Sequence, residues 1–431
     1  MILEFRTHEP AWEIVLSDKG TSISLSYDGV PIDYYDRQGR LVGMFVNDRH
    51  YRRGLDNRLM EKFRVPGERG RIRRDLLGVE KRRLIDGAYD RARRVAEQVR
   101  SGKVSGVRAR MSDAPDLRNE ALERLEPITR YDYARLEAER ELFNRIYAPV
   151  GILPPDQYMS LVVQMTVGCS YNKCTFCDFY QTRRFEIKTP DALREHLRGV
   201  VRFFGDSARL RKSVFLADGN ALVIPQKKLM ERLAVVHEFF TFVPPEIEGR
   251  VERSAWRKEH PGSFEGLFSF LDAFSALKKS AAEFEELRKH HLRRVYVGLE
   301  SGDDDLLRFL RKPGDAASMV EAVEVIKAAG LSVGVILMVG VGGDRYAEQH
   351  VRHTIEAVNS MRLSEGDILY LSDFVNHPGL PYERLAKERG IRDLDYGELV
   401  AQRGRIRAGL CWPDPTRPPK VALYDIREFI Y

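Results

Sequence analysis

Cysteine is scarce in this sequence, which has only four cysteines among 431 residues. Three of them, Cys169, Cys174 and Cys177, fall within nine consecutive positions, and the fourth is Cys411. Three clustered cysteines and one distant cysteine cannot supply a framework of paired disulfides, so a reducing compartment is favoured. We therefore expect the three clustered thiols to work as thiolates.

Long apolar runs are also missing. No stretch approaches the roughly 18 apolar residues of a membrane-spanning helix, and the N-terminal residues lack the basic-then-apolar order of a signal peptide. The composition, 43% hydrophobic and 31% charged, is that of an ordinary chain that can bury a sizeable core. These features predict a cytoplasmic protein with no membrane span.

The cysteine cluster has three possible interpretations. Incidental cysteines are disfavoured because free cysteines scatter through a sequence. A structural zinc site needs four ligands, commonly as two paired knuckles, and no second knuckle accompanies these three residues. A four-iron cluster held by three thiolates leaves one iron open to bind another molecule, so for this site three ligands are a meaningful number.

Apolar runs alternate with helical patterns from the cysteines onward. The expected strands are 161–167, 213–220, 266–272, 294–300, 332–340 and 367–375, each of the first five followed by a helix-like stretch. Continuous apolar strands in this order predict a parallel sheet that closes, wholly or in part, into a (β/α)6 barrel. Its chemistry is expected at the carboxyl ends of the strands, where the cysteines lie.

The sequence GCSYNKCTFCDFY, residues 168–180, resembles the cluster loop of the radical S-adenosylmethionine superfamily. Four residues separate the first two cysteines here, where the usual pattern has three. The segment VGLESGDDDLLRFLRK, from residue 297, resembles the corresponding segment of the Elp3, MiaB and coproporphyrinogen oxidase-like group. The resemblance covers roughly residues 158–385 and implies a partial, TIM-like radical S-adenosylmethionine barrel.

The resemblance also implies which residues contact S-adenosylmethionine. It places Phe176 near the adenosyl group and the turn Asp218-Gly219-Asn220 at the methionine amino group. Glu300 and Ser301 are expected near the ribose and the methionine, and a guanidinium or ammonium at 311–312 can pair the methionine carboxylate. The implied cofactor contacts are Phe176, Asp218, Gly219, Asn220, Glu300, Ser301, Arg311 and Gly340, the last because glycine allows close backbone approach.

What the resemblance implies for activity is a [4Fe-4S] cluster on Cys169, Cys174 and Cys177 and S-adenosylmethionine as the second cofactor. Reductive cleavage would give a 5′-deoxyadenosyl radical that abstracts hydrogen from an unidentified substrate. The electron would come from a flavodoxin- or ferredoxin-type partner. Two alternatives stay open: an iron-sulfur protein that binds S-adenosylmethionine without turnover, and a zinc-stabilised nucleic-acid-binding protein.

The N-terminal part has a different character. Residues 11–46 alternate apolar and polar residues between turn signals, which predicts a small antiparallel sheet of about four strands. Residues 51–110 hold 19 lysines and arginines against 8 acidic residues, whereas the net charge of the whole chain is only +6. This excess suits a polyanion such as RNA, or an anionic lipid surface, and it equally suits a solvated helix face.

Four segments are therefore expected. They are a β-rich region (1–66), a basic helical segment and linker (67–157), the barrel (158–385) and a closing segment (386–431). Cys411, in the closing segment, is expected to be a small buried residue.

Overall fold

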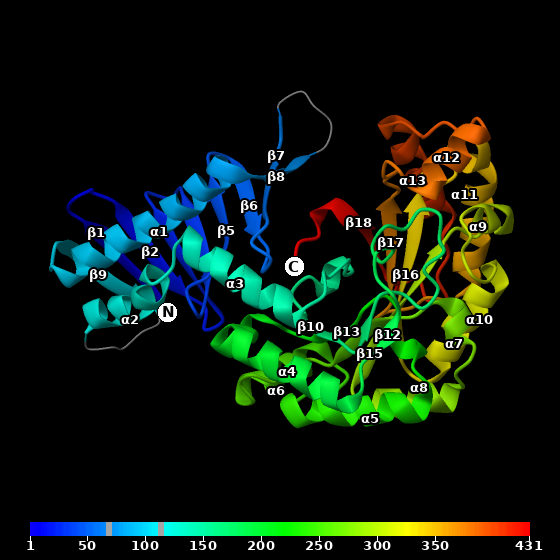
Figure 1. Cartoon of the computed structure of the whole chain (residues 1–431), viewed down its shortest axis with the longest axis horizontal. Coiled ribbons are helices and arrows are strands. Elements are labelled where there is room, and N and C mark those ends of the chain that lie inside the picture. The colour runs from blue at the N-terminus through cyan, green and yellow to red at the C-terminus, as the bar shows by residue number, and fades with distance from the viewer. Residues whose placement is uncertain (66–70, 111–115) are drawn as a thin grey trace. The chain divides into compact units, whose positions relative to one another are not determined.

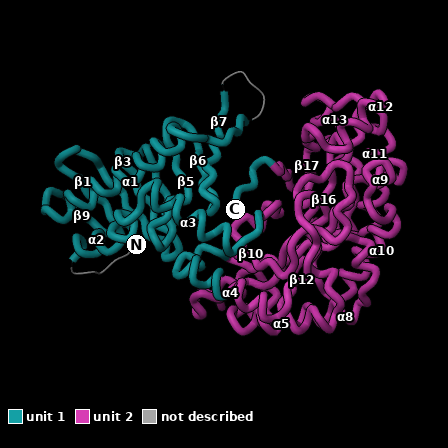
Figure 2. The backbone as a smooth tube through the Cα atoms, viewed as in Figure 1, with its two compact units in different colours: residues 1–149, 198–211, 427–431 teal, residues 150–197, 212–426 magenta. Residues whose placement is uncertain are grey.

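The computed structural model describes residues 1–65, 71–110 and 116–431. Within them the chain forms two compact units (Figure 2). Unit 1 contains residues 1–149, 198–211 and 427–431, and unit 2 contains residues 150–197 and 212–426. The contacts thus group the chain differently from the four expected segments, and the boundary expected between residues 66 and 67 lies outside the described residues.

Unit 1 is built on a nine-stranded antiparallel sheet with the order β8-β7-β6-β5-β4-β3-β2-β1-β9. The strands are β1 (Ile2–Thr7), β2 (Glu13–Asp18), β3 (Ser22–Tyr27), β4 (Ile32–Asp36), β5 (Leu41–Val46), β6 (Arg49–Arg53), β7 (Leu59–Phe63), β8 (Ile72–Leu76) and β9 (Val104–Arg110). The four antiparallel strands predicted within residues 11–46 are confirmed as β2 to β5, and five further strands extend the sheet to nine. Three of the additional strands, β7, β8 and β9, lie within the arginine-rich stretch 51–110.

Alternating burial decides which face of this sheet carries the core. In β2, Ile14 and Leu16 are buried whereas Glu13 and Val15 are exposed. Helices α1 (Gly78–Arg100), α2 (Leu117–Thr129) and α3 (Tyr133–Ile146) cover the buried face (Figure 1). Their apolar stripes and the inward strand residues form one continuous hydrophobic core.

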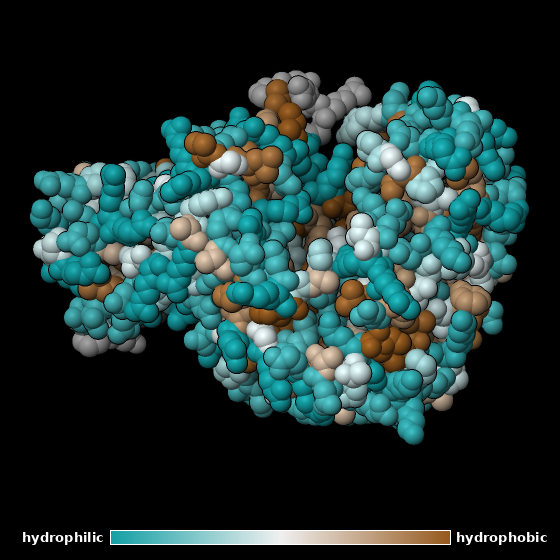
Figure 3. Space-filling view, in the orientation of Figure 1, coloured by the Kyte–Doolittle hydropathy of each residue, from teal (hydrophilic) through white to brown (hydrophobic). Residues whose placement is uncertain are grey.

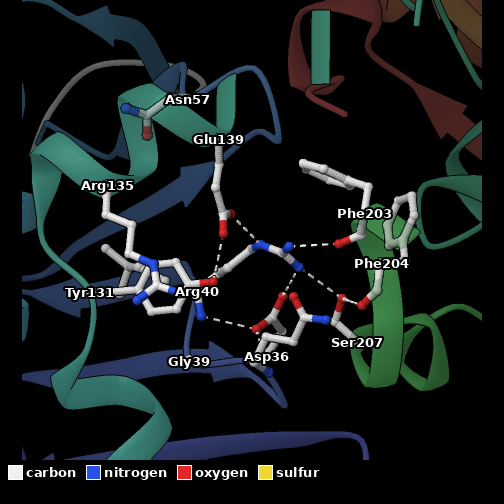
Figure 4. A network of polar contacts seen from close by, with 12 residues as sticks. Asp36, Gly39, Arg40, Asn57, Tyr131, Arg135, Glu139, Phe203, Phe204 and Ser207 are labelled. Carbon is white, nitrogen blue, oxygen red and sulfur yellow. Dashed lines mark hydrogen bonds and ion pairs between the residues drawn. The ribbon is translucent and has the colours of Figure 1, made fainter. Parts of the chain in front are cut away.

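A buried arginine joins separate stretches of unit 1 (Figure 4). Arg40 Nε donates to Glu139 Oε2 at 2.5 Å, and Arg40 Nη2 donates to the Phe203 carbonyl at 2.6 Å. Arg40 Nη1 donates to Ser207 Oγ at 3.1 Å. Because Phe203 and Ser207 belong to residues 198–211, this network ties that segment to the N-terminal sheet.

Unit 2 contains a seven-stranded parallel sheet with the order β10-β13-β14-β15-β16-β17-β18. The strands are β10 (Leu161–Gln164), β13 (Val214–Ala217), β14 (Leu267–Phe270), β15 (Leu292–Glu300), β16 (Ser332–Val339), β17 (Ile368–Asp373) and β18 (Lys420–Tyr424), and β11 (Thr166–Val167) pairs separately with β12 (Glu186–Ile187). The six expected parallel strands are confirmed, and β18 adds a seventh. The α/β fold class with a β-rich N-terminal region is also confirmed.

Helices connect successive strands of unit 2 and lie outside its sheet (Figure 1). They are α4 (Pro190–Phe204), which ends within unit 1, α5 (Gln226–Phe239), α6 (Arg250–Glu259), α7 (Ala273–Ala276), α8 (Ala281–Lys289), α9 (Asp304–Phe309), α10 (Ala316–Ala328), α11 (Gly343–Ser360), α12 (Pro381–Glu388) and α13 (Tyr396–Gly409). Short 3-10 helices are η1 (Pro155–Gln157), η2 (Gly205–Leu210), η3 (Ala221–Val223) and η4 (Ile426–Glu428). Of the helices in the described ranges, none has the length and apolar character needed to cross a membrane.

Most strands of the parallel sheet in unit 2 are buried on both faces, whereas the edge strand β18 is partly exposed. All four residues of β10 and all four of β13 are inaccessible, as expected for parallel strands covered by helices. The visible surface is mostly hydrophilic, with apolar groups in scattered patches (Figure 3).

Candidate active site

A cavity lies in unit 2 at the carboxyl ends of the parallel strands. Its walls are mostly apolar and aromatic, with a few polar groups among them. The lining includes Cys169, Cys174, Phe176, Cys177, Gly219, Asn220, Asp272, Tyr296, Glu300, Lys312, Met338, Phe374, His377 and Tyr424. The cavity therefore lies where a parallel α/β sheet normally places its chemistry.

The cysteine loop is held in place by bonds from its neighbours. Thr175 N donates to the Leu310 carbonyl at 2.9 Å, and the Thr175 carbonyl accepts from Tyr382 N at 3.0 Å. Tyr171 Oη donates to the Arg311 carbonyl at 2.8 Å. The loop that carries three cysteines is thus fixed against α12 and the turn after α9.

The three thiols converge on this one cavity. Burial raises the pKa of Cys174 to about 11 and the pKa of Cys177 to about 12, and repulsion from neighbouring thiolates adds to both shifts. A metal centre removes that cost because its positive charge favours the thiolate. The donor set therefore fits a four-iron cluster with one iron left open.

A single-ion site is a different case. In residues 1–65, 71–110 and 116–431, no group of three or more His, Cys, Asp or Glu side chains could hold a metal ion. Thiolates of an iron-sulfur cluster each bind a different iron atom, so they need not surround one point. The zinc site considered from the sequence consequently has no ligand set in this part of the chain.

The turn after β13 supports the cysteine loop and borders the cavity. The buried Asp218 carboxylate accepts from Gly168 N at 3.1 Å, so it holds the start of the loop from behind. A Cβ on Gly219 would lie 2.7 Å from the Tyr180 ring, which only a glycine avoids. Gly219 and Asn220 line the cavity, whereas Asp218 does not contribute to its lining.

Asp272 is a cavity carboxylate that the sequence interpretation missed. Asn220 Nδ2 donates to the Asp272 carboxylate, and Asp272 Oδ1 accepts from Ser275 N at 2.8 Å as the N-cap of α7. Asp272 ends the expected third strand, in the motif GLFSFLD. An acidic residue at the carboxyl end of a buried strand was the signal that could have identified it.

Glu300 and Lys312 form an ion pair on the cavity wall. Lys312 Nζ donates to Glu300 Oε1 at 2.8 Å, and the two side chains are only 11% and 10% exposed. Burial alone would lower the pKa of Lys312, but the Glu300 carboxylate raises it above its ordinary value. Glu300 has a left-handed backbone with φ of 61°, an uncommon conformation that concentrates at functional sites.

Ser301, Arg311 and Gly340 do not contribute to the described lining of the cavity. Ser301 is buried, and its Oγ lies 2.8 Å from His350 Nδ1 of α11. Gly340 N donates to Gln402 Oε1 of α13 at 2.7 Å. The Arg311 side chain is exposed, so the structure puts Lys312 on the cavity wall in its place.

Aromatic side chains complete the cavity. Phe176, between the second and third cysteines, lines it and packs against the same apolar cluster as Phe374. Tyr424, from the unexpected strand β18, also lines it, and its Oη donates to the Leu153 carbonyl at 2.8 Å. Sequence reasoning missed Tyr424 because it missed that strand.

Cys411 is exposed, so the expectation that it is buried is wrong. Its backbone N donates to Asn359 Oδ1 at 2.8 Å while its thiol faces solvent. It follows the end of α13 and does not contribute to the described lining of the cavity.

The chain was compared with known proteins. Residues 163–358 match the family model described as the radical SAM superfamily. Among curated proteins, no sequence match is found.

Solved structures give weaker likenesses. The cobalamin-dependent S-adenosylmethionine radical enzyme OxsB is 12% identical, with a TM-score of 0.37, and the match covers 58% of this chain and 31% of that one. Coproporphyrinogen III oxidase (HemN) from Escherichia coli is 14% identical, with a TM-score of 0.41, 62% of this chain covered and 54% of that one. Methylornithine synthase (PylB) is 15% identical, with a TM-score of 0.37, and the match covers 67% of this chain and 76% of that one. The matched part spans about a third of OxsB and about half of HemN.

The family match includes all three clustered cysteines, the four parallel strands β13 to β16 in full and the end of β10. Enzymes of this superfamily use a [4Fe-4S] cluster and S-adenosylmethionine. The chain therefore contains a radical SAM domain at residues 163–358.

Proposed function

We propose that this chain holds a [4Fe-4S] cluster on Cys169, Cys174 and Cys177 and cleaves S-adenosylmethionine to a 5′-deoxyadenosyl radical that abstracts hydrogen from a substrate. When bound, the cluster supplies one electron to the sulfonium of S-adenosylmethionine. The observation that carries the proposal is the convergence of three thiols on one mostly apolar cavity at the strand ends.

The cavity has polar groups suited to the amino-acid end of S-adenosylmethionine. That end carries one ammonium and one carboxylate, so it needs an anionic and a cationic partner. Asp272 and Asn220 can accept from the ammonium, and Lys312 can donate to the carboxylate. Lys312 donates to one oxygen of the Glu300 carboxylate, so the other oxygen can accept a hydrogen bond from a ribose hydroxyl.

Of the residues named from the sequence, Phe176, Gly219, Asn220 and Glu300 are proposed to contact the cofactor directly. We assign Asp218 and Ser301 positioning roles instead, because their side chains bond to the cysteine loop and to α11. Arg311 and Gly340 lie outside the cavity lining and are not proposed as contacts.

The remaining walls favour an uncharged substrate moiety. Tyr296, Met338 and Tyr424 are apolar or aromatic, and the charged pair Glu300–Lys312 is already internally neutralised. Such walls also keep water away from a reactive radical. The substrate itself is not assigned, RNA as a partner stays a prediction, and so does the cytoplasmic location.

The test is anaerobic reconstitution followed by iron and sulfide analysis, then incubation with S-adenosylmethionine and dithionite. About four irons per chain and formation of 5′-deoxyadenosine are expected. Cys174→Ala should lose most iron and all cleavage, and Cys411→Ala is the matched control because that thiol is exposed and remote in sequence.

The two alternatives predict other results. An iron-sulfur protein without turnover would keep about four irons and make no deoxyadenosine. A zinc-stabilised nucleic-acid-binding protein would retain zinc in place of iron. Either result contradicts the proposed function.

A further inference from the structure

A basic surface lies on the outside of the cysteine loop. Two adjoining hollows in unit 2 share Arg308 as a lining residue. Together they carry the cations Lys173, Arg308, Arg311, Arg345 and Arg389, which we call the cluster-side basic surface. Cys174 lines both the inner cavity and the hollow that contains Lys173 and Arg311. The cluster-side basic surface therefore adjoins a proposed cluster ligand.

Most of these cations are not neutralised by the protein. Across the described residues, Lys173, Arg311, Arg345 and Arg389 make no ion pair with a carboxylate, whereas Arg308 pairs with Asp305. All five side chains belong to exposed residues. A surface that keeps unpaired, exposed cations attracts negatively charged partners over a distance of about one Debye length.

The arginines are nevertheless held in position. Arg389 Nη1 donates to Tyr346 Oη at 3.2 Å, and its guanidinium lies 4.8 Å from the centroid of the Phe309 ring. Arg345 Nη1 donates to the Arg389 carbonyl at 3.2 Å. Because these contacts restrain the guanidinium groups without cancelling their charge, less side-chain freedom is lost when a partner binds.

Acidic groups facing this surface are few. Asp303 and Asp305 line the hollows, but Asp303 lies 2.7 Å from His353 Nδ1 and caps α9, and Asp305 pairs with Arg308. Lys312 also lines the hollow that contains Lys173 and Arg311, but it is paired with Glu300. The balance of the surface is therefore positive.

We propose that the cluster-side basic surface is the docking site of a small acidic one-electron carrier protein. The inference rests on the proposed function, since a cluster held by Cys174 needs an electron from outside. In the described chain the single further cysteine, Cys411, cannot by itself hold a second cluster. Each encounter transfers one electron from the reduced flavin or iron-sulfur centre of the carrier to the [4Fe-4S] cluster, so the carrier is oxidised by one electron.

Charge complementarity decides in favour of this occupant. Electron-transfer partners form small, transient interfaces that are steered by opposite charge, and their association depends strongly on salt. An interface of a few cations beside a redox centre matches that class. A single-stranded RNA would additionally need fully exposed aromatic rings for base stacking, whereas the rings that line these hollows are buried (Phe309) or half-buried (Tyr171 and Tyr346).

The test uses reconstituted holoenzyme and a purified acidic flavodoxin as the probe. The double variant Arg345→Glu/Arg389→Glu should weaken flavodoxin binding, measured by calorimetry at low salt, by about tenfold or more. The control Lys289→Glu/Arg417→Glu changes the net charge equally at two exposed cations that are already paired, and it should bind like the wild type. Wild-type binding should itself fall as salt is raised.

A second readout separates docking from chemistry. Iron content and dithionite-driven cleavage of S-adenosylmethionine should be unchanged in the double variant, because dithionite needs no docking surface, while reduction by flavodoxin hydroquinone should slow by about tenfold. Equal flavodoxin binding by wild type and double variant, or no binding by the wild type, overturns the proposal. So does a single-stranded RNA 20-mer that the wild type binds and the double variant loses while flavodoxin binding is retained. If dithionite-driven cleavage fails in the wild type, the proposed function falls, and the binding comparison still tests the docking site.

Discussion

The arginine-rich stretch 51–110 and the cluster-side basic surface use cations in opposite ways. In the first, Arg91 pairs with the fully buried Asp33 at 2.8 Å, and Arg74 pairs with the buried Glu61 at 2.5 Å. These ion pairs help to hold the sheet and helices of unit 1 together. Most other cations of the stretch with described partners also pair with a carboxylate, many of them at exposed positions.

The cluster-side basic surface has fewer cations, and four of them lack a carboxylate partner in the part of the chain that the structure describes. A count along the sequence cannot show where unneutralised charge lies, because it does not reveal which acids fold back onto which arginines. What attracts a partner is unneutralised charge at a surface, and only the fold decides where that charge remains.

The largest expected effect comes from a buried, paired cation. Arg40→Ala should lower the free energy of unfolding by about 3 to 5 kcal/mol, because it leaves the Asp36 and Glu139 carboxylates without their cation. The measurement is urea-induced unfolding. Arg389→Ala removes an unpaired cation and should change stability by about 0.5 kcal/mol or less. Equal losses in the two variants would contradict the contrast between the buried, paired cations of unit 1 and the unpaired cations of the cluster-side basic surface.

A smaller effect is expected from acid. Burial alone would raise the pKa of Glu61, but hydrogen bonds from Arg74 and Arg49 outweigh it and hold the pKa below its ordinary value of 4.5. The stability that ionised Glu61 contributes is thus fully present above pH 4.5 and is lost as pH falls through the lower folded pKa.

Urea midpoints of unfolding, measured at a series of pH values, should therefore fall less steeply below pH 4.5 in Glu61→Gln than in the wild type. Glu97→Gln, in an exposed pair with Arg100, should follow the wild type. A Glu61→Gln profile that overlays the wild type would show that this ion pair does not carry the acid dependence.

The smallest effect concerns RNA. On α1, Arg83 and Arg94 make no ion pair with any described carboxylate, so few cations of that helix are available for phosphates. Binding of a single-stranded RNA 20-mer, followed by fluorescence anisotropy from about 50 to about 200 mM salt, should show a log-log slope no steeper than about −3. A slope near −6 or steeper, abolished by Arg83→Glu/Arg94→Glu, would restore this stretch as a polyanion-binding surface.

The barrel was more predictable than the N-terminal sheet for a physical reason. Parallel strands are buried on both faces, so each appears as a continuous apolar run, and all six expected strands are found. β8 and β18 contain IRRDL and KVALY and are largely exposed, so neither has such a run. Charged strands of this kind are stabilised by cross-strand and ion-pair contacts that the local sequence does not reveal.

The site was predictable only where its residues are local in sequence. The cysteine loop and Glu300 follow from motifs, and the structure puts them on one cavity. Which of two adjacent cations faces that cavity does not follow from a motif. Arg311 has a left-handed backbone with φ of 52°, and Lys312, the next residue, is the one that pairs with Glu300. Asp272 follows a different strand, β14, and only the fold shows that it reaches the same cavity.

The contact between Gly219 and Tyr180 constrains how this site can change over evolutionary time. Any side chain at position 219 would run into the aromatic ring, so a mutation there is costly while the ring is present. The reverse order is open, because a smaller residue at position 180 first creates space that a side chain at position 219 can later fill. Lineages that carry a larger residue at 219 should therefore have replaced Tyr180 first, which gives these two positions a fixed order of substitution.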